Sequence, residues 1–342
     1  MLNGKEYRDW IGSRMKMGEE LLYLSESECR ALPITDKEVF DLTERALILY
    51  SERKVDMPAK IAIHPLPGTF YHAMPCSIEE MSSAGIKWGM CYPDNRVNFG
   101  IKQTSCLLIY NEYLSGVPLA VMDALFITEI RTPCVAFASA KHMAKQNAKT
   151  FGMIGCGTQG KEHVRIVNNT LKDVDTIYIY DVYEDMMDAL IKQNQNKVSA
   201  KIIKAKSIEE VIKSSEVVAS AAVITDSPQP EIKDEWVVKG QTFLSSDLHS
   251  HFEDVTIKRM DKYTLDSISQ HELLSGFNYY PQGLPNIYAE IGEVCAGKKP
   301  GRENDDEIIF CNNVGMAVED MMVARILFDR ALEAKAGRFV PL

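Results

Sequence analysis

The sequence predicts an α/β protein in which one domain is built on a parallel sheet. From residue 150 onward, short apolar runs alternate with helical patterns, an order typical of parallel strands joined by crossover helices. The length of 342 residues is enough for two domains or one large domain. The six strand candidates are Thr150–Ile154, Thr176–Tyr180, Lys201–Lys204, Val217–Val223, Thr242–Ser246 and Tyr263–Leu265.

The segments on either side of this region follow other patterns. Residues 25–53 read as helical, with Ser25 or Ser27 as a possible cap, and residues 126–147 read as one amphipathic helix. Between them lie short strand-like runs, of which Cys106–Tyr110 and Val117–Met122 flank a hairpin turn.

A last helix is predicted over residues 314–336, capped by Asn312 or Asn313. It lies beyond the alternating region and returns to the N-terminal part. We therefore expect a discontinuous α+β domain of residues 1–125 and 311–342, and a second domain of residues 126–310.

Composition narrows the classes of partner and compartment. The chain has 38 Lys and Arg against 48 Asp and Glu, a formal net charge of −10, which argues against nucleic acid or an anionic membrane as partner. No apolar run reaches the roughly 18 residues of a membrane span, and residues 1–20 lack the apolar core of a secretory signal. The eight cysteines are scattered without a CxxC pair, so we expect free thiols, no metal site and a cytoplasmic protein.

A glycine-rich turn carries the most specific signal. Gly155, Gly157 and Gly160 have the G-x-G-x-x-G spacing, directly after a predicted strand and at the start of a predicted helix. The next strand ends in Asp181, about 20 residues further on, as the dinucleotide fingerprint requires. The pattern predicts a Rossmann domain whose helix N-terminus stabilises a pyrophosphate.

Asp181 also indicates which dinucleotide binds. A carboxylate there would accept hydrogen bonds from the ribose hydroxyls and repel a 2′-phosphate, and no Arg or Lys follows it directly. We therefore expect NAD rather than NADP as cofactor. The alternative is a glycine-rich turn that binds no cofactor.

Asp247 is the candidate catalytic carboxylate. It directly follows a predicted strand, and ligands of open α/β sheets bind at the carboxyl ends of the strands. Removal of hydride from an amine carbon needs a neutral amine, so a nearby general base helps. A capping or loop aspartate is the alternative, and His249 and His251 could also titrate.

Three cations are candidates for binding a substrate carboxylate. Lys60, Lys87 and Arg131 stand beside apolar residues rather than in charged runs. Each could instead be a salt-bridged or snorkelling side chain.

Together these segments resemble the ornithine cyclodeaminase/μ-crystallin family, over residues 37–330. The resemblance implies Lys60, Lys87 and Arg131 around the substrate carboxylate, and Lys87 and Asp247 as catalytic groups. It also implies a homodimer. The matching segments, in order, are Met57–Lys60, Ala73–Pro75, Gly85–Lys87, Ser115–Ala124, Thr128–Thr132, Gly155–Gly160, Ser246–Asp247 with Glu253, Ala296–Arg302 and Val314–Asp320. The expected cofactor-binding residues are Thr132, Gly155, Gly157, Thr158, Gln159, Gly160 and Asp181.

The resemblance implies an NAD-dependent enzyme that acts on the α-amine of a small L-amino acid. The first hypothesis is ornithine cyclodeaminase, which converts L-ornithine to L-proline and ammonia while hydride is removed and returned. The alternative is an L-amino-acid dehydrogenase or ketimine reductase with net NADH turnover. A non-catalytic dinucleotide-binding protein is a third class. His72, a candidate substrate-binding residue, stands where ornithine cyclodeaminases look to have a glutamate, which weakens the case for ornithine.

Overall fold

The computed structural model describes residues 1–224, 230–249, 251–277, 279–280 and 282–342. It contains two compact units: Met1–Arg131 with Met316–Leu342, and Thr132–Gly315. The sequence-based boundaries lie a few residues earlier, at 125/126 and 310/311. The continuous helix α5, Leu125–Met143, runs through the first of these boundaries, so periodicity alone offers no break there.

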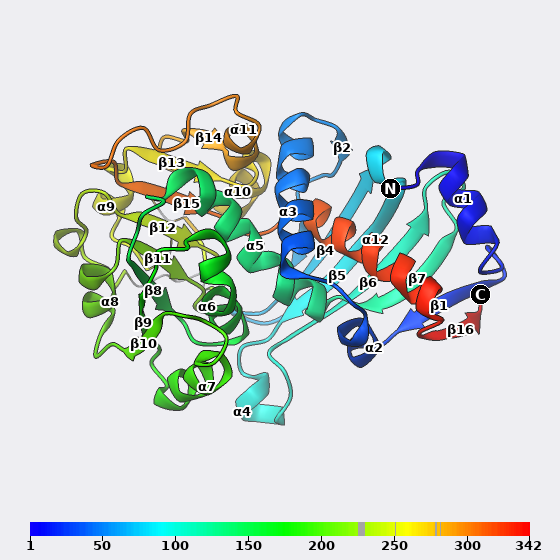
Figure 1. The fold of residues 1–342 in the computed structure, drawn as a ribbon, viewed down its shortest axis with the longest axis horizontal. Coiled ribbons are helices and arrows are strands. Elements are labelled where there is room, and N and C mark those ends of the chain that lie inside the picture. Colours follow the sequence, from blue (N-terminus) through cyan, green and yellow to red (C-terminus); the bar gives the residue numbers. More distant parts are fainter. Residues whose placement is uncertain (225–229, 250, 278, 281) are drawn as a thin grey trace. The chain divides into compact units, whose positions relative to one another are not determined.

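The second unit is built on a parallel sheet of eight strands (Figure 1), in the order β10-β9-β8-β11-β12-β15-β13-β14. β8, β9 and β10 have the predicted bounds, and β11, β12 and β13 differ from prediction by one to three residues. The strands are β8 Thr150–Ile154, β9 Thr176–Tyr180, β10 Lys201–Lys204, β11 Val217–Ser220, β12 Thr242–Ser245, β13 Lys262–Leu265, β14 Ala289–Glu290 and β15 Ile309–Asn312. The other helices of this unit are α6 Thr158–Thr170, α7 Glu184–Asn194, α8 Ile208–Ser214, α9 Asp254–Lys258, α10 Ile268–Ser275 and α11 Ile291–Cys295.

β15 is a strand that the sequence patterns do not predict. Because it includes Asn312, the predicted cap of the last helix is wrong. β15 pairs with both β12 and β13 and is buried throughout. Asn312 is its last residue, and Asn313 follows it without capping a helix. The last helix, α12, begins at Ala317, where Glu319 accepts a hydrogen bond from the Met316 backbone.

The first unit contains a mixed sheet in the order β16-β1-β7-β6-β5-β4-β2, with β3 paired to β4. The predicted hairpin is confirmed as β6 and β7, which pair antiparallel. The strands are β1 Glu20–Leu24, β2 Val55–Asp56, β3 Ile61–Ile63, β4 Phe70–Ile78, β5 Ser83–Cys91, β6 Thr104–Glu112, β7 Pro118–Asp123 and β16 Arg338–Pro341. The helices are α1 Gly4–Gly12, α2 Glu26–Ala31, α3 Asp36–Ser51, α4 Asn95–Phe99 and α12 Ala317–Ala334.

The helix predicted over residues 25–53 is two helices. Leu32 between them is extended, as expected for a residue before proline, and Pro33 has no N–H to continue the first helix. Ser25 caps α2 in a capping box with Glu28, which confirms one of the two predicted caps. Thr35 caps α3 in the same way.

Helix α12 lies across β4, β5 and β6 and packs against α3 (Figure 1). It is buried along almost its whole length, and the buried residues include Glu319, Asp320 and Arg325. Charged side chains in such a position must be paired, because burying an unpaired charge is costly.

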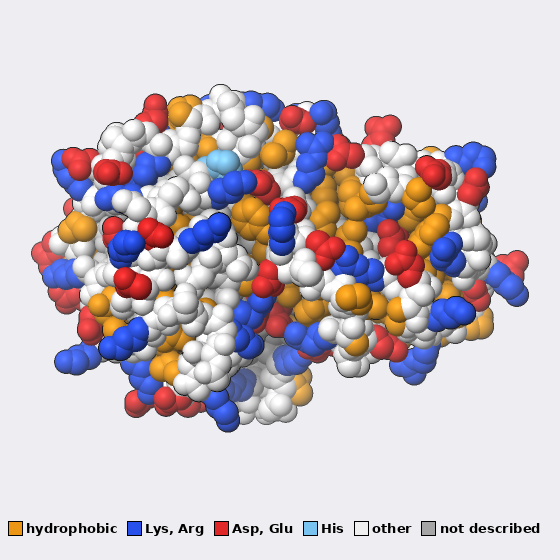
Figure 2. Space-filling model, viewed as in Figure 1, with side chains coloured by type: hydrophobic (Ala, Val, Ile, Leu, Met, Phe, Trp, Pro, Cys, Tyr) orange, Lys and Arg blue, Asp and Glu red, His pale blue; other side chains and the backbone are white. Residues whose placement is uncertain are grey.

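The surface agrees with the acidic, mixed composition. Acidic and basic side chains are interspersed over the face of the molecule shown in Figure 2. Among the described residues, no helix is long and apolar enough to cross a bilayer. All eight cysteines carry free thiols.

Candidate functional site

The glycine turn of the second unit has the geometry of a phosphate-binding loop. Gly155 has a φ of +89°, and a Cβ there would lie 2.7 Å from the Ala221 oxygen. A Cβ on Gly160 would collide with the backbone oxygen of Gly155, so only glycine lets α6 start so close to the strand. A Cβ on Gly157 would meet no protein atom within 4 Å. The space beside Gly157 thus fits a ligand that approaches the backbone, as a dinucleotide pyrophosphate does.

The remaining residues predicted to bind the cofactor lie at the start of α6 and on α5. Gly157 precedes the helix and supplies no side-chain cap, and the N-terminus of a helix favours an anion. Thr158, which is exposed, and Gln159 are the first two helical residues. Thr132 lies half-buried on α5.

Asp181, directly after β9, stabilises the same turn. Its Oδ2 accepts a hydrogen bond of 2.7 Å from the Cys156 backbone, and its Oδ1 accepts one of 2.9 Å from the Tyr183 backbone. An ionised carboxylate has about four acceptor positions, so capacity remains for ribose hydroxyls. Val182 and Tyr183 are exposed and uncharged, so no cation directly after Asp181 offers to bind a 2′-phosphate.

Asp247 is buried at the carboxyl ends of β11 and β12. Its Oδ1 accepts hydrogen bonds from Ser220 Oγ at 2.7 Å and Ser245 Oγ at 2.8 Å. Its Oδ2 accepts one from the Ala222 backbone at 2.8 Å. These three donors fix the orientation of a carboxylate that is only 1% exposed.

The loop after β11 joins Asp247 to the glycine turn. Ala221 lies against Gly155, and the next residue, Ala222, donates to Asp247. The predicted base and the predicted pyrophosphate loop therefore share one edge of the parallel sheet, where open α/β sheets bind ligands. His251 Nε2 lies 3.9 Å from Asp247 Oδ2.

Two of the predicted carboxylate-binding cations lie together in the first unit. Lys87 Nζ is 2.5 Å from Asp320 Oδ2, and Arg131 Nε is 3.0 Å from Asp320 Oδ1. Arg131 Nη1 also lies 2.9 Å from Glu319 Oε2. All four side chains are at most 5% exposed. Lys87 donates further to Thr128 Oγ1 at 3.3 Å.

The two cations govern the protonation of Asp320. Burial by itself would raise the pKa of this carboxyl, but Arg131 and Lys87 outweigh burial and hold the pKa below its ordinary value. Asp320 is therefore ionised and stands between the two cations. This arrangement orients Lys87 and Arg131, whose ammonium and guanidinium groups carry three and five N–H donors.

His72 lies on the same face of the sheet as Lys87, because Lys87 pairs with Met74, two residues after His72 on β4. His72 itself pairs with Gly89 on β5. Burial, with Lys60 and Lys87 adding to it, lowers the pKa of His72 to about 2, so its imidazole is neutral. Its Nε2 is buried without a hydrogen-bond partner among the described residues. Lys60, just before β3, is only 5% exposed.

The sequence patterns do not identify Glu319 and Asp320 as partners of the predicted cations, although both lie in the segment Val314–Asp320 that carries the family resemblance. The signal that could have found them is a pair of adjacent carboxylates inside an otherwise apolar helix. Two buried acids predict two buried cations near them, because burial of an unpaired charge is costly.

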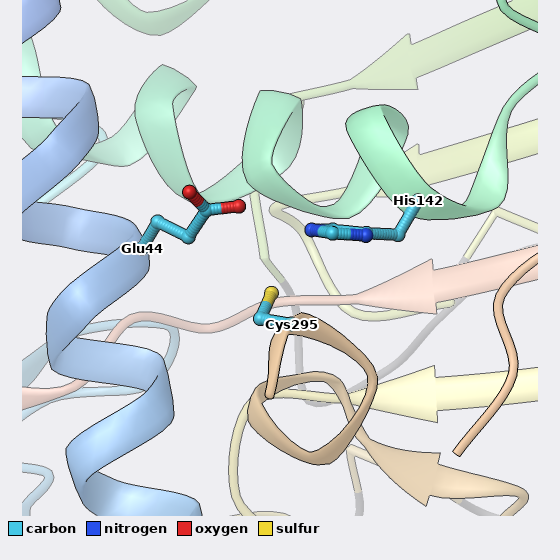
Figure 3. Close-up of side chains that lie close together, drawn as sticks. All are labelled: Glu44, His142 and Cys295. Atoms are coloured by element: carbon cyan, nitrogen blue, oxygen red, sulfur yellow. The ribbon is translucent and has the colours of Figure 1, made fainter. Parts of the chain in front are cut away.

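The second unit also brings His142, on α5, close to Cys295, on α11. Their ligand atoms lie within 4.8 Å of one another (Figure 3). Glu44, also drawn in Figure 3, belongs to the first unit. One nitrogen and one sulfur are fewer than the three or four protein ligands of a zinc site, so we assign no metal to this pair.

Comparison with known proteins extends the sequence resemblance. The model of the ornithine cyclodeaminase/mu-crystallin family matches residues 22–335. The alanine dehydrogenase of Archaeoglobus fulgidus is 32% identical over 326 residues, which cover 93% of this chain and 97% of that protein. The N-((2S)-2-amino-2-carboxyethyl)-L-glutamate dehydrogenase of Staphylococcus aureus is 28% identical, over 94% of this chain and 98% of that protein.

Solved structures agree with this relationship. The fold matches an archaeal alanine dehydrogenase dimer with bound NAD at a TM-score of 0.82 and 30% identity, covering 94% of this chain and 99% of the other. It matches the Δ1-pyrroline-2-carboxylate reductase of Thermococcus litoralis, in complex with NADH and L-proline, at a TM-score of 0.82 and 25% identity, covering 93% and 99%. The family match and the shared architecture together show that this chain belongs to the ornithine cyclodeaminase/mu-crystallin family.

Proposed function

We propose that this protein is an NAD-dependent enzyme that oxidises the α-amine of a small, uncharged L-amino acid or reduces the matching imine, with net turnover of NADH. The observation that carries the proposal is Asp247. A buried carboxylate, oriented by three donors, shares a sheet edge with a glycine turn that leaves room for a dinucleotide. The similar proteins include an alanine dehydrogenase and pyrroline-2-carboxylate reductases.

Each residue group has a distinct role in this proposal. Lys87 and Arg131 bind the substrate carboxylate, with Asp320 orienting both, and Lys60 adds positive potential. Asp247 accepts a proton from the ammonium group, which makes the amine neutral before the α-carbon is oxidised. In the reverse direction it returns that proton to the nitrogen. When bound, the nicotinamide supplies the hydride acceptor or donor.

His72 supports an uncharged substrate side chain over that of ornithine. It stands neutral near two lysines, and its Nε2 has no hydrogen-bond partner among the described residues. A second substrate amine would meet like charges there rather than a carboxylate. We therefore place a dehydrogenase or imine reductase ahead of ornithine cyclodeamination, which the first test also examines.

The test is to mix the protein with NAD and a panel of L-amino acids, and to follow NADH and product mass together. NADH that accumulates with a keto acid, or with a cyclic imine, supports the proposal and names the substrate. Proline formed from ornithine without NADH would replace the proposal by cyclodeamination. No turnover of any amino acid or imine, with NAD bound, would favour a non-catalytic binding protein.

Asp247→Asn tests the assigned base. We expect the turnover number to fall by roughly 10²- to 10⁴-fold, the usual contribution of a general acid–base group. NAD affinity should change little, because the pyrophosphate site is made of backbone groups. Asp173→Asn is the matched control, since Asp173 is an exposed aspartate that pairs with Lys149. Unchanged turnover in the Asp247 variant would remove Asp247 from the mechanism.

We also propose a homodimer that forms through the face of the mixed sheet opposite α12. Ile61, Ala73, Trp88 and Leu107 form one apolar row across four neighbouring strands. Trp88 is 43% exposed and Leu107 is 49% exposed, unusual for large apolar side chains in a continuous row. The related archaeal alanine dehydrogenase is a dimer. Leu107→Asp should convert the dimer to a monomer in light scattering, and a monomeric wild type would contradict the proposal.

A further inference from the structure

A continuous chain of buried polar side chains lies at the carboxyl ends of β13 and β15, outside the groups assigned so far. It begins at Asp266, directly after β13. Asp266 Oδ1 lies 3.0 Å from His271 Nε2, and His271 Nδ1 lies 2.6 Å from the Tyr280 hydroxyl. Asp266 and His271 are at most 1% exposed. Hydrogen bonds in such a buried chain polarise and strengthen one another.

Asn312, the last residue of β15, joins this half to a second half. Its Nδ2 donates to the Tyr280 hydroxyl at 3.1 Å and to the Tyr263 hydroxyl at 2.7 Å. The Tyr263 hydroxyl lies 3.0 Å from His249 Nδ1. The imidazole of His249 also packs against the ring of Tyr280, with centroids 4.7 Å apart. The chain therefore ends two residues after Asp247.

The donors decide the direction of each hydrogen bond. An amide nitrogen can only donate, so both tyrosine oxygens accept from Asn312 and keep their own protons to donate. If His271 has one ring proton, Tyr280 donates to its Nδ1, and its Nε2 carries the proton and donates to Asp266. If the Asn312 amide were turned round, a neutral His271 would point a lone pair at that carboxylate. The contact between His271 and Asp266 therefore favours this orientation of Asn312.

At the other end, the same logic applies to His249. Tyr263 donates to its Nδ1, so a neutral His249 carries its proton on Nε2. Burial lowers the pKa of His249 to about 4. The imidazole is therefore uncharged at neutral pH.

The turn that carries Asp247 depends on such support. Leu248 has a φ of +65°, a left-handed conformation that a leucine seldom adopts without tertiary contacts that hold it. The Phe252 backbone donates to the His249 oxygen at 3.0 Å, which closes the turn. His249 is the side chain through which the buried chain reaches this turn.

We propose that Asp266, His271, Tyr280, Asn312 and Tyr263 act through His249 as positioning residues for Asp247. They hold the turn after β12 in place and fix His249 as the Nε2–H tautomer, an uncharged donor near the reacting amine. The inference rests on the proposed function only for the role of Asp247. The hydrogen-bonded chain and the tautomer can be tested without substrate.

The first test is ¹⁵N NMR of histidine-labelled protein at pH 7.5, with His249→Gln to assign the signals among the seven histidines. We expect the Nε2–H pattern for His249 in the wild type. Tyr263→Phe removes one hydroxyl but keeps the ring that stacks on Phe310. In that variant, His249 should show a mixture of both tautomers. An Nδ1–H pattern in the wild type, or no change in the variant, would overturn the assignment.

The second test separates positioning from mere folding. Tyr263→Phe should lower kcat on the order of tenfold and leave KM for NAD nearly unchanged, because a misplaced base slows chemistry and not cofactor binding. Tyr288→Phe is the matched control, since its hydroxyl donates to the Pro300 oxygen outside this chain, and its kcat should not change. Unchanged kcat in Tyr263→Phe would refute the positioning role.

Tyr280→Phe breaks the chain at its next hydroxyl and serves if the Tyr263 variant does not fold. It should lower kcat in the same way, and unchanged kcat there would equally refute the proposal. An inactive wild type would defeat the proposed function, whereas the NMR pattern would still confirm or overturn the tautomer.

Discussion

The candidate anion-binding groups of the two units differ in kind: backbone N–H groups in the second unit and buried charged side chains in the first. In the second unit, the turn from Gly155 to Gly160 presents backbone N–H groups, and glycines shape it. In the first unit, Lys87 and Arg131 are buried side chains, held by two carboxylates of α12. The backbone site depends on space and local conformation, whereas the side-chain site depends on charge balance in a buried environment. The two should therefore fail in different ways.

The largest effect should come from the backbone site. In Gly160→Ala, the new Cβ would collide with the Gly155 oxygen, so the turn must open. We expect both NAD binding and thermal stability to be lost. NADH fluorescence titration and thermal unfolding measure the two quantities. Normal NAD affinity in this variant would contradict the assigned geometry.

Gly157→Ala tests the space available to the ligand without changing contacts within the protein. Its Cβ would meet no protein atom, so the melting temperature should remain that of the wild type. NAD affinity should nevertheless fall, because the methyl group fills the space beside the backbone where a pyrophosphate would approach. Unaltered affinity would show that the dinucleotide lies elsewhere.

Asp320→Asn tests the side-chain site. It leaves Lys87 and Arg131 buried with one carboxylate fewer, and breaking a buried ion pair typically costs about 3–5 kcal/mol. Chemical denaturation should show a loss of this order. The control is Asp188→Asn, which removes an exposed partner of Lys204 and should cost about 1 kcal/mol or less. Equal losses in the two variants would contradict the charge-balance account.

Acid should affect the first unit through His72. Its pKa is about 2 in the folded chain but near its ordinary 6.5 in the unfolded chain, so the unfolded state binds the proton first. The stability that neutral His72 provides is therefore present above pH 6.5 and lost as the pH falls toward 2. His72→Gln should flatten the decline between pH 6 and pH 4 by at most about 1.4 kcal/mol per pH unit.

The control for this measurement is the exposed His64, replaced by glutamine. We expect the unfolding free energy of the His64→Gln variant to depend on pH as that of the wild type does. A decline that is equally steep in the His72 variant would mean that His72 is not buried as a neutral group.

The smallest effects should be alike in the two units. Thr35 caps α3 and Ser207 caps α8, each by accepting a backbone hydrogen bond. Replacement of either by alanine should cost about 1 kcal/mol of unfolding free energy, because an N-cap is a local interaction. A much larger loss at one site would indicate a tertiary role for that residue.

Local patterns predicted much of the second unit. The strands Thr150–Ile154 and Thr176–Tyr180 have their predicted bounds, and the glycine turn between them has the expected geometry. Strand, turn and helix are adjacent in the chain there, so the sequence order is also the spatial order. The prediction failed where strands that are neighbours in the sheet are not consecutive in the chain. β15 follows β14 in the chain but lies between β12 and β13 in the sheet.

The cation group shows the limit of sequence reasoning most clearly. The sequence makes Lys87 and Arg131 candidates for binding a carboxylate, with a salt-bridged side chain as the alternative for each. In the structure they are ion-paired and also grouped, with Asp320 between them. Neither the partner nor the grouping follows from periodicity, because Asp320 is brought to them by a helix near the end of the chain.

The α/β class, the family and the dinucleotide turn follow from local spacing and order, as do the residue types available for amino-acid chemistry. Only the folded chain shows that Asp320 orients Lys87 and Arg131, that His72 is neutral, and that Asp247 accepts hydrogen bonds from Ser220, Ser245 and Ala222. These properties depend on burial and on contacts between distant segments, and both arise only when the chain folds.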